Sequence, residues 1–159
     1  MPESPLLSQT AEYALRTVLY IAAVPGGAAV RVEELAAQLA LPRNYLSKTL
    51  HRLAREGILA STRGRGGGFR LARPAARIHL LDVVGLFDRI GGNRRCLLGR
   101  PVCSDRTACD AHGRWKDVAE RVAGFFRETT VADLLGGPPS QTGLNAPRRS
   151  RRTALTRTG

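Results

Sequence analysis

The stretch "RNYLSKTLHRLAREGILASTRGRGGGFRLA", residues 43–72, decides the fold. In its first half, leucines recur at the spacing of one helical face, and the positions between them are mostly polar or cationic. Gly57 follows as a C-terminal capping residue. The pattern predicts a helix over 43–55 that buries three leucines and leaves a cationic face for a partner. The three are Leu46, Leu50 and Leu53.

The second half of the stretch predicts a β-hairpin. Two short segments, 59–62 and 69–72, flank the run "RGRGGG" at 63–68, in which four of six residues are glycine. Glycine adopts positive φ angles at little cost, so the run favours a turn with Arg63 and Arg65 near its tip. A dinucleotide-binding interpretation fails, because this glycine run precedes a strand and not the N-terminus of a helix.

Upstream of this stretch, two more helices are predicted. Residues 8–24 have helical periodicity with Ser8 as N-cap, and Pro25 ends the pattern. An extended piece then leads to a second helix over 32–40. The predicted elements follow the order of a winged helix-turn-helix: a helix, a short helix, a tight turn, a cationic helix and a basic hairpin. Such a unit places one helix in the major groove of DNA.

Downstream, helical periodicity resumes over 78–88, and an amphipathic helix is predicted over 115–129. Its wide apolar face needs a covering surface, either the core of the same chain or a partner helix. The fold class predicted is mainly α with a small β-hairpin wing, plus a long C-terminal dimerisation helix. The domains predicted are a DNA-binding unit (1–77), a linker helix with sensor loop and dimerisation helix (78–135), and a disordered Arg-rich tail (136–159).

Charge points to a polyanionic partner. The net charge is +12, and residues 41–77 hold nine Lys or Arg against one Glu. Basic residues release counterions when they neutralise phosphates, which favours double-stranded DNA as partner. An RNA-binding protein that uses the Arg-rich tail is an alternative. The candidate DNA-contacting residues are Arg43, Asn44, Tyr45, Ser47, Lys48, His51, Arg52, Arg63 and Arg65.

Other classes of protein are not favoured. The longest apolar run, residues 18–24, is too short to span a bilayer, and the chain does not open with a secretory signal pattern. We therefore expect a cytoplasmic protein with no membrane partner. No nucleophile–base pair or paired carboxylates indicate a catalytic site, so we do not expect an enzyme.

Six segments resemble one known family. They are "AEYALRTVLYIA" (11–22), "NYLSKTLHRLAREGIL" (44–59), "STRGRGGGFRLARP" (61–74), "LLDVV" (80–84), "RWKDVAERVAGFF" (114–126) and "TTVADLL" (129–135). Together they resemble the bacterial IscR/NsrR-type winged-helix regulators of the Rrf family over about residues 8–135. The resemblance implies a homodimeric transcription factor, expected to be a repressor, that binds a palindromic operator and pairs its long C-terminal helix with that of its partner.

All three cysteines lie close together, at Cys96, Cys103 and Cys109, and His112 follows. An odd number of thiols in a cytoplasmic protein argues against a disulfide framework. Zinc ligands are usually paired two to four residues apart, whereas thiolates spread along a loop suit an iron–sulfur cluster. The resemblance also implies a 2Fe-2S or 4Fe-4S cluster on these cysteines. Six residues separate the first two where the commonest pattern has five, which leaves the cluster type open.

The fourth cluster ligand has two candidates. His112 matches the histidine of the cluster-assembly regulators, and Glu12 matches a carboxylate that the other subunit supplies in nitric-oxide-sensing relatives. His112 is favoured because it is tethered to the same loop. The function predicted is a regulator whose operator affinity depends on a cluster that senses redox state, iron or nitric oxide. Regulation by thiol oxidation or zinc, without iron–sulfur, is the alternative.

Overall fold

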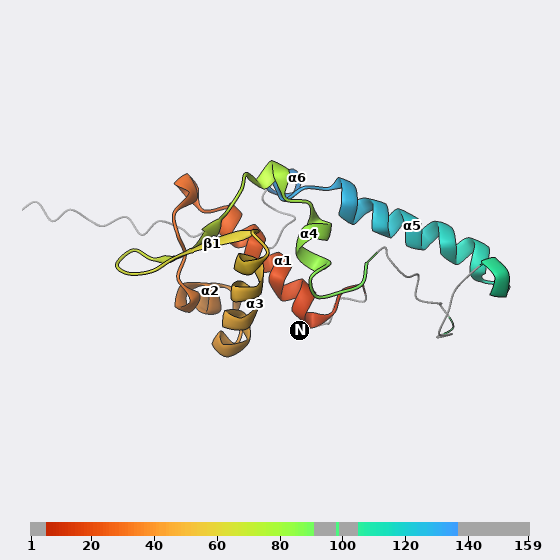
Figure 1. Cartoon of the computed structure of the whole chain (residues 1–159), viewed down its shortest axis with the longest axis horizontal. Coiled ribbons are helices and arrows are strands. Elements are labelled where there is room, and N and C mark those ends of the chain that lie inside the picture. The colour runs from red at the N-terminus through yellow and green to blue at the C-terminus, as the bar shows by residue number, and fades with distance from the viewer. Residues whose placement is uncertain (1–5, 91–97, 99–104, 137–159) are drawn as a thin grey trace, which may run out of the picture.

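A computed structural model of the chain describes residues 6–90, 98 and 105–136 (Figure 1). Three helices precede a two-stranded antiparallel hairpin, and three more helices follow it. The elements are α1 (Gln9–Ala22), α2 (Val32–Leu39), α3 (Arg43–Arg55), β1 (Leu59–Thr62), β2 (Gly68–Leu71), α4 (Leu80–Val84), α5 (His112–Glu128) and α6 (Val131–Leu135). This order confirms the mainly helical winged helix-turn-helix. The predicted tail lies almost entirely outside the described residues.

Helix α1 is the centre of the molecule. It packs against α2, α3, α4, α6 and β2. The Oγ atom of Ser8 accepts a hydrogen bond from the backbone N–H of Ala11 at 3.3 Å, which confirms the predicted N-cap. The helix ends at Ala22, two residues earlier than predicted, and a short 3₁₀ turn, Pro25–Gly27, follows.

The connection between α2 and α3 is tight. Helix α2 ends at Leu39 because Ala40 has a left-handed backbone with φ of 53°. Arg31 gives α2 no side-chain cap, as the sequence suggests, so packing of the buried Leu35 and Leu39 holds this short helix in place.

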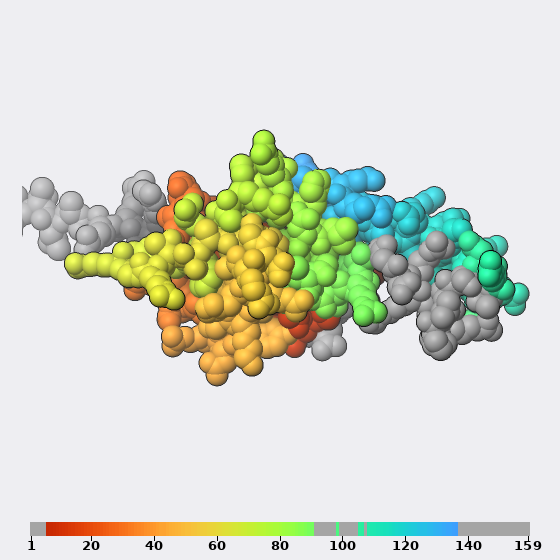
Figure 2. All heavy atoms as spheres, viewed as in Figure 1, coloured from red at the N-terminus to blue at the C-terminus, as the bar shows by residue number. Residues whose placement is uncertain are grey.

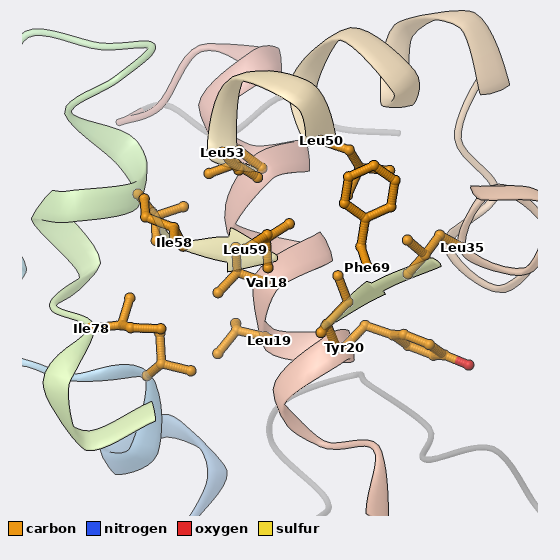
Figure 3. Close-up of a cluster of buried hydrophobic side chains, with 14 of the residues drawn as sticks. Val18, Leu19, Tyr20, Leu35, Leu50, Leu53, Ile58, Leu59, Phe69 and Ile78 are labelled. Carbon is orange, nitrogen blue, oxygen red and sulfur yellow. The ribbon is translucent and has the colours of Figure 1, made fainter. Parts of the chain in front are cut away.

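The core gathers side chains from every element of the winged-helix unit. Figure 3 shows leucines of α3 above the hairpin residues, with α1 behind them and Ile78 from the segment before α4 at one side. The three leucines predicted for α3 are all buried. The largest fully buried side chains are Val18, Val30, Leu35, Leu46, Leu50, Leu53, Ile58, Leu59, Ile78, Leu80, Val83 and Val84.

The hairpin is fastened to this core at its base. Leu59 pairs with Leu71 and Thr62 with Gly68, and the buried Phe69 exchanges two backbone hydrogen bonds with Val30, at 2.8 and 2.9 Å. A Cβ on Gly68 would lie 2.4 Å from the carbonyl oxygen of Val30. Only glycine permits this approach, so the glycine run determines how the wing attaches as well as how it turns.

The C-terminal half differs most from its prediction. In place of a helix over 78–88, a 3₁₀ turn (Ala75–Arg77) precedes the five-residue α4. The short α6, which is not predicted as a separate helix from the sequence, follows α5, and the segment that joins the two helices returns to the start of α4. Leu80 donates to the carbonyl of Thr129 at 2.9 Å, and Val131 donates to that of Ile78 at 2.8 Å. These bonds tie the end of α5 to the winged-helix unit.

Helix α5 runs outward from that attachment. It begins at His112, three residues before the predicted start, so this histidine is the first residue of a helix rather than part of a loop. Figure 2 shows the hairpin, in yellow, protruding at one end of the molecule and α5, in blue to cyan, extending from the other. Within the residues described, no helix has the length and apolar character needed to cross a membrane.

Candidate DNA interface and sensor segment

Helix α3 presents an outer flank to solvent, opposite its buried leucines. Asn44 and Lys48 are exposed one helical turn apart, at the N-terminal half of the helix. The N-terminal half of a recognition helix is the part that meets base edges in helix-turn-helix complexes. Arg43 precedes them and forms an exposed 2.5 Å ion pair with Glu33 of α2, so this arginine is held beside the end of the helix.

A second flank of α3 faces the wing. His51 Nδ1 donates to the backbone carbonyl of Ser47 at 2.7 Å, because a carbonyl oxygen can only accept. The edge of the imidazole meets the ring of Phe69 in β2, with 5.8 Å between ring centroids. The hairpin thus fixes the orientation of His51 on the helix surface. Arg63 and Arg65 lie beyond it, both exposed at the wing tip.

A third flank of α3 faces α1 and the segment after α4. The Tyr45 hydroxyl is hydrogen-bonded to the hydroxyl of Thr10, and the Tyr45 and Tyr13 rings form an edge-to-face pair with 5.7 Å between their centroids. Seven residues further along the same flank, the guanidinium of Arg52 lies 5.0 Å from the centre of the Phe87 ring. Two of the predicted DNA-contacting side chains are therefore engaged with the body of the protein.

The sensor segment is described only in part, because Cys96 and Cys103 lie outside the described residues. Cys109 is half-buried, and its carbonyl accepts a 2.8 Å hydrogen bond from the backbone N–H of His112. Cys109 and His112 therefore belong to one turn that opens α5. The described part of the chain holds no cluster of three or more metal-ligating side chains, but it includes only one of the three cysteines.

His112 is oriented by a carboxylate. Its side chain is 7% exposed, and Nε2–H donates to Oδ1 of Asp105 at 2.9 Å. Lys116, one turn further along α5, lies 3.2 Å from the same oxygen. Hydrogen bonds from His112 and from Lys116 lower the pKa of the Asp105 carboxyl, so it stays ionised. Metal-bound histidines are commonly oriented by such a carboxylate, and the pair of Cys109 and His112 suits an iron–sulfur ligand set.

Glu12 lies in a different part of the chain. It is in the first turn of α1, and its carboxylate forms a 3.8 Å ion pair with Arg16. Figure 1 shows that α5 projects from the rest of the described chain and that its first residues lie at the outer end, away from α1. One subunit does not bring Glu12 and His112 together, so Glu12 could be a ligand beside His112 only if a second copy supplied it.

Three residues that position the candidate site escaped sequence reasoning: Thr10, Phe87 and Asp105. Each contacts a residue that is not its neighbour in sequence; Thr10 and Tyr45, for example, are 35 positions apart. None of the three is an unusual residue type for the local pattern in which it occurs. Asp105, seven residues before His112, was the one with a detectable signal, because a carboxylate near a candidate histidine ligand is a common partner.

Comparison with known proteins identifies the family. The model of the Rrf2 family, described as iron-dependent transcriptional regulators, matches residues 7–137. The chain belongs to the Rrf2 family. It is 33% identical over 132 residues to a protein of Aquifex aeolicus named as an HTH-type transcriptional regulator, covering 82% of this chain and 91% of that one. It is 30% identical over 129 residues to the regulator IscR of Serratia proteamaculans, covering 81% and 78%.

Solved structures show the same fold. IscR of T. potens superposes with a TM-score of 0.65 at 22% identity, over 81% of this chain and 85% of that one. CymR, the global cysteine regulator of B. subtilis, superposes with a TM-score of 0.66 at 20% identity, over 82% and 96%. This Rrf2 chain is therefore a DNA-binding transcriptional regulator with a winged helix-turn-helix, and its relatives are regulators, not enzymes.

Proposed function

We propose that this Rrf2 protein binds operator DNA through the outer and wing-facing flanks of α3, through the exposed Arg52 on its third flank, and through the hairpin. Asn44, Ser47 and Lys48 reach base edges in the major groove, and His51 stands beside them. Arg43, Arg52, Arg63 and Arg65 hold phosphates, while Tyr45 fixes α3 on α1. The observation that carries this assignment is the exposed polar flank of α3, held beside the cationic wing by the contact of His51 with Phe69.

The protein acts as a homodimer, because α5 leaves apolar surface uncovered. Val118 and Phe125 are about half exposed, at 50% and 51%. A second copy of α5 would cover both and would place two recognition helices on a palindromic site. Phe126 and Ala123 are buried against the protein's own body, so only part of the apolar face remains for the partner.

The sensor is an iron–sulfur cluster held by Cys96, Cys103 and Cys109, with His112 as the fourth ligand. Support comes from the turn that joins Cys109 to His112 and from the buried, carboxylate-oriented imidazole. The cluster, when bound, supplies a redox-active centre that oxidants, iron shortage or nitric oxide can alter. Asp105 holds the histidine in one tautomer, and Lys116 keeps that carboxylate ionised.

The cluster is tested by anaerobic purification followed by visible absorption spectroscopy and analysis for iron, sulfide and zinc. We expect a brown protein whose charge-transfer bands disappear in Cys109→Ala. In His112→Ala the cluster should become labile, while Glu12→Ala should leave it unchanged. A colourless protein that contains zinc, or that responds only to thiol oxidants, would establish the thiol or zinc alternative. A cluster that Glu12→Ala alone destabilises would transfer the fourth ligand to the partner subunit.

The DNA interface is tested by the salt dependence of binding. Arg65→Ala should lower the slope of log affinity against log salt concentration by about one unit, because one phosphate contact is lost. Arg127→Ala is the matched control, since it removes the same charge from α5, where Arg127 pairs with Glu120 at 2.6 Å. Asn44→Ala should change sequence preference instead. Equal affinity for single-stranded RNA and duplex DNA would contradict the assignment.

A further inference from the structure

The contact between Arg52 and Phe87 joins the last turn of α3 to the segment that follows α4. Arg52 is an exposed residue in the last turn of α3. Phe87 lies three residues beyond the end of α4, half-buried against the edge of the core. The guanidinium carbon stands 5.0 Å from the ring centre, within the range of an attractive cation–π contact.

The ring is itself held firmly. Phe87 and Asp88 both donate backbone hydrogen bonds to the carbonyl of Val84, at 3.0 and 2.8 Å. The carboxylate of Asp88 then accepts a 2.7 Å hydrogen bond from the backbone N–H of Ser8, at the start of α1. These bonds fix the segment against two helices, so Phe87 offers Arg52 a rigid surface.

A guanidinium that lies on a ring keeps its N–H groups available at its edge. Arginine can therefore rest on an aromatic face and donate to a phosphate oxygen at the same time, which lysine cannot do with the same geometry. A side chain that is already ordered loses less conformational entropy when DNA binds. This saving in conformational entropy is larger for a long, exposed arginine than for a short side chain, because the arginine has more rotatable bonds to order.

We propose that Phe87 is a positioning residue, which orders the Arg52 guanidinium for a phosphate contact at the DNA interface. This inference rests on the proposed use of α3 to bind DNA. It adds a specific cause for the direction in which Arg52 points, and it assigns a role to a residue outside the winged-helix motif. Phe87 also lies nine residues before Cys96, in the segment that enters the sensor loop.

The test is a double-mutant cycle on the full chain, with a labelled mixed-sequence duplex of about 30 base pairs as probe, long enough for two half-sites. Phe87→Leu keeps an apolar side chain but removes the ring face. We expect it to weaken duplex binding about two- to fivefold, the range of an exposed cation–π contact. Phe87→Tyr keeps the ring and should bind as the wild type does. In an Arg52→Ala background, Phe87→Leu should cause no further loss.

A second pair of variants keeps the proposal testable if Phe87→Leu unfolds. Arg52→Lys preserves the charge and loses the planar group, so it should bind about two- to fivefold more weakly. Arg55→Lys is the matched control on the same helix, since Arg55 pairs with Glu56 at 3.9 Å and not with a ring. It should bind normally.

Three outcomes would overturn the positioning role: unchanged binding in Phe87→Leu, an equal loss in the Arg52→Ala background, or equal effects of the two Arg→Lys changes. Each of them would leave DNA binding by the wild type in place. Failure of the wild-type protein to bind the duplex would reject the proposed function, and the positioning role with it. The two failures are therefore distinguishable by the wild-type titration alone.

Discussion

The winged-helix unit and helix α5 use their apolar residues in opposite ways. The unit buries its leucines and valines within one chain, around α1. Among the apolar residues of α5, Ala123 and Phe126 towards its C-terminal end are buried, whereas Val118 and Phe125 remain half exposed. The difference separates a part whose core is complete within one chain from a helix that leaves apolar surface for the proposed second copy. It also places the sensor residues at the less supported end of the molecule.

The largest difference in stability between substitutions in the two regions is expected at Leu50. This side chain is fully buried in α3, and Leu50→Ala should lower the free energy of unfolding by about 2–5 kcal/mol, since it leaves a cavity. Val118→Ala on α5 is the control, because it removes fewer contacts from a half-exposed site. Urea denaturation at low protein concentration measures both. Equal losses would show that α5 belongs to the same core as α3.

The next largest effect is expected at Phe125. Phe125→Glu puts a charge in the uncovered surface of α5 and should weaken the dimer by about 2 kcal/mol or more, as loss of a central aromatic anchor does. Sedimentation equilibrium gives the dissociation constant. Ser61→Glu, at an exposed position of β1, introduces the same charge at a distance and should leave the dimer intact. A dimer that tolerates Phe125→Glu would exclude α5 as its interface.

A smaller change is expected where α5 begins. Asp105→Asn keeps the shape of the side chain but weakens its hold on His112, so a cluster bound there should be lost about tenfold faster. The decay of the visible absorption under air measures this. Asp110→Asn, an exposed acid in the same turn, should decay like the wild type. Equal lifetimes in all three proteins would mean that His112 needs no orientation for cluster binding.

The smallest effect concerns the junction between the two regions. Thr130 caps α6, and the carboxylate of Asp133 accepts hydrogen bonds from the hydroxyl and from the backbone N–H of Thr130. These two hydrogen bonds lower the pKa of the Asp133 carboxyl. Thr130→Ala should cost about 1 kcal/mol at neutral pH, as loss of an N-cap does.

The pH dependence of this junction follows from the direction of the pKa change. Because the folded pKa lies below the unfolded one, the stabilisation is present above pH ~4 and is lost as the pH falls through the folded pKa. Thermal denaturation at several pH values should show the Thr130→Ala deficit shrinking in acid. A deficit that stays constant with pH would mean that Asp133 does not contribute to the cap.

Local patterns predicted the winged-helix unit well. The leucines of α3, the Ser8 cap and the glycine hairpin each depend on residues near them in sequence, so periodicity and turn chemistry were sufficient. Prediction was poorer after residue 77. The expected helix over 78–88 is shortened to α4, and it begins two residues late because residues 78–80 pair with residues 129–131. That pairing is between segments about fifty residues apart and has no local signature.

The candidate site divides in the same way. The sequence by itself determined which residues are candidates for binding DNA or a cluster: the polar positions of α3, the arginines of the wing, and the three cysteines that lie close to His112. Only the tertiary structure decided how these side chains are held. Tyr45 is bound to Thr10, Arg52 lies on Phe87, and His112 is oriented by Asp105. The physical reason is that residue type sets what a side chain can bond to, whereas the packing of distant segments sets which of those bonds it makes.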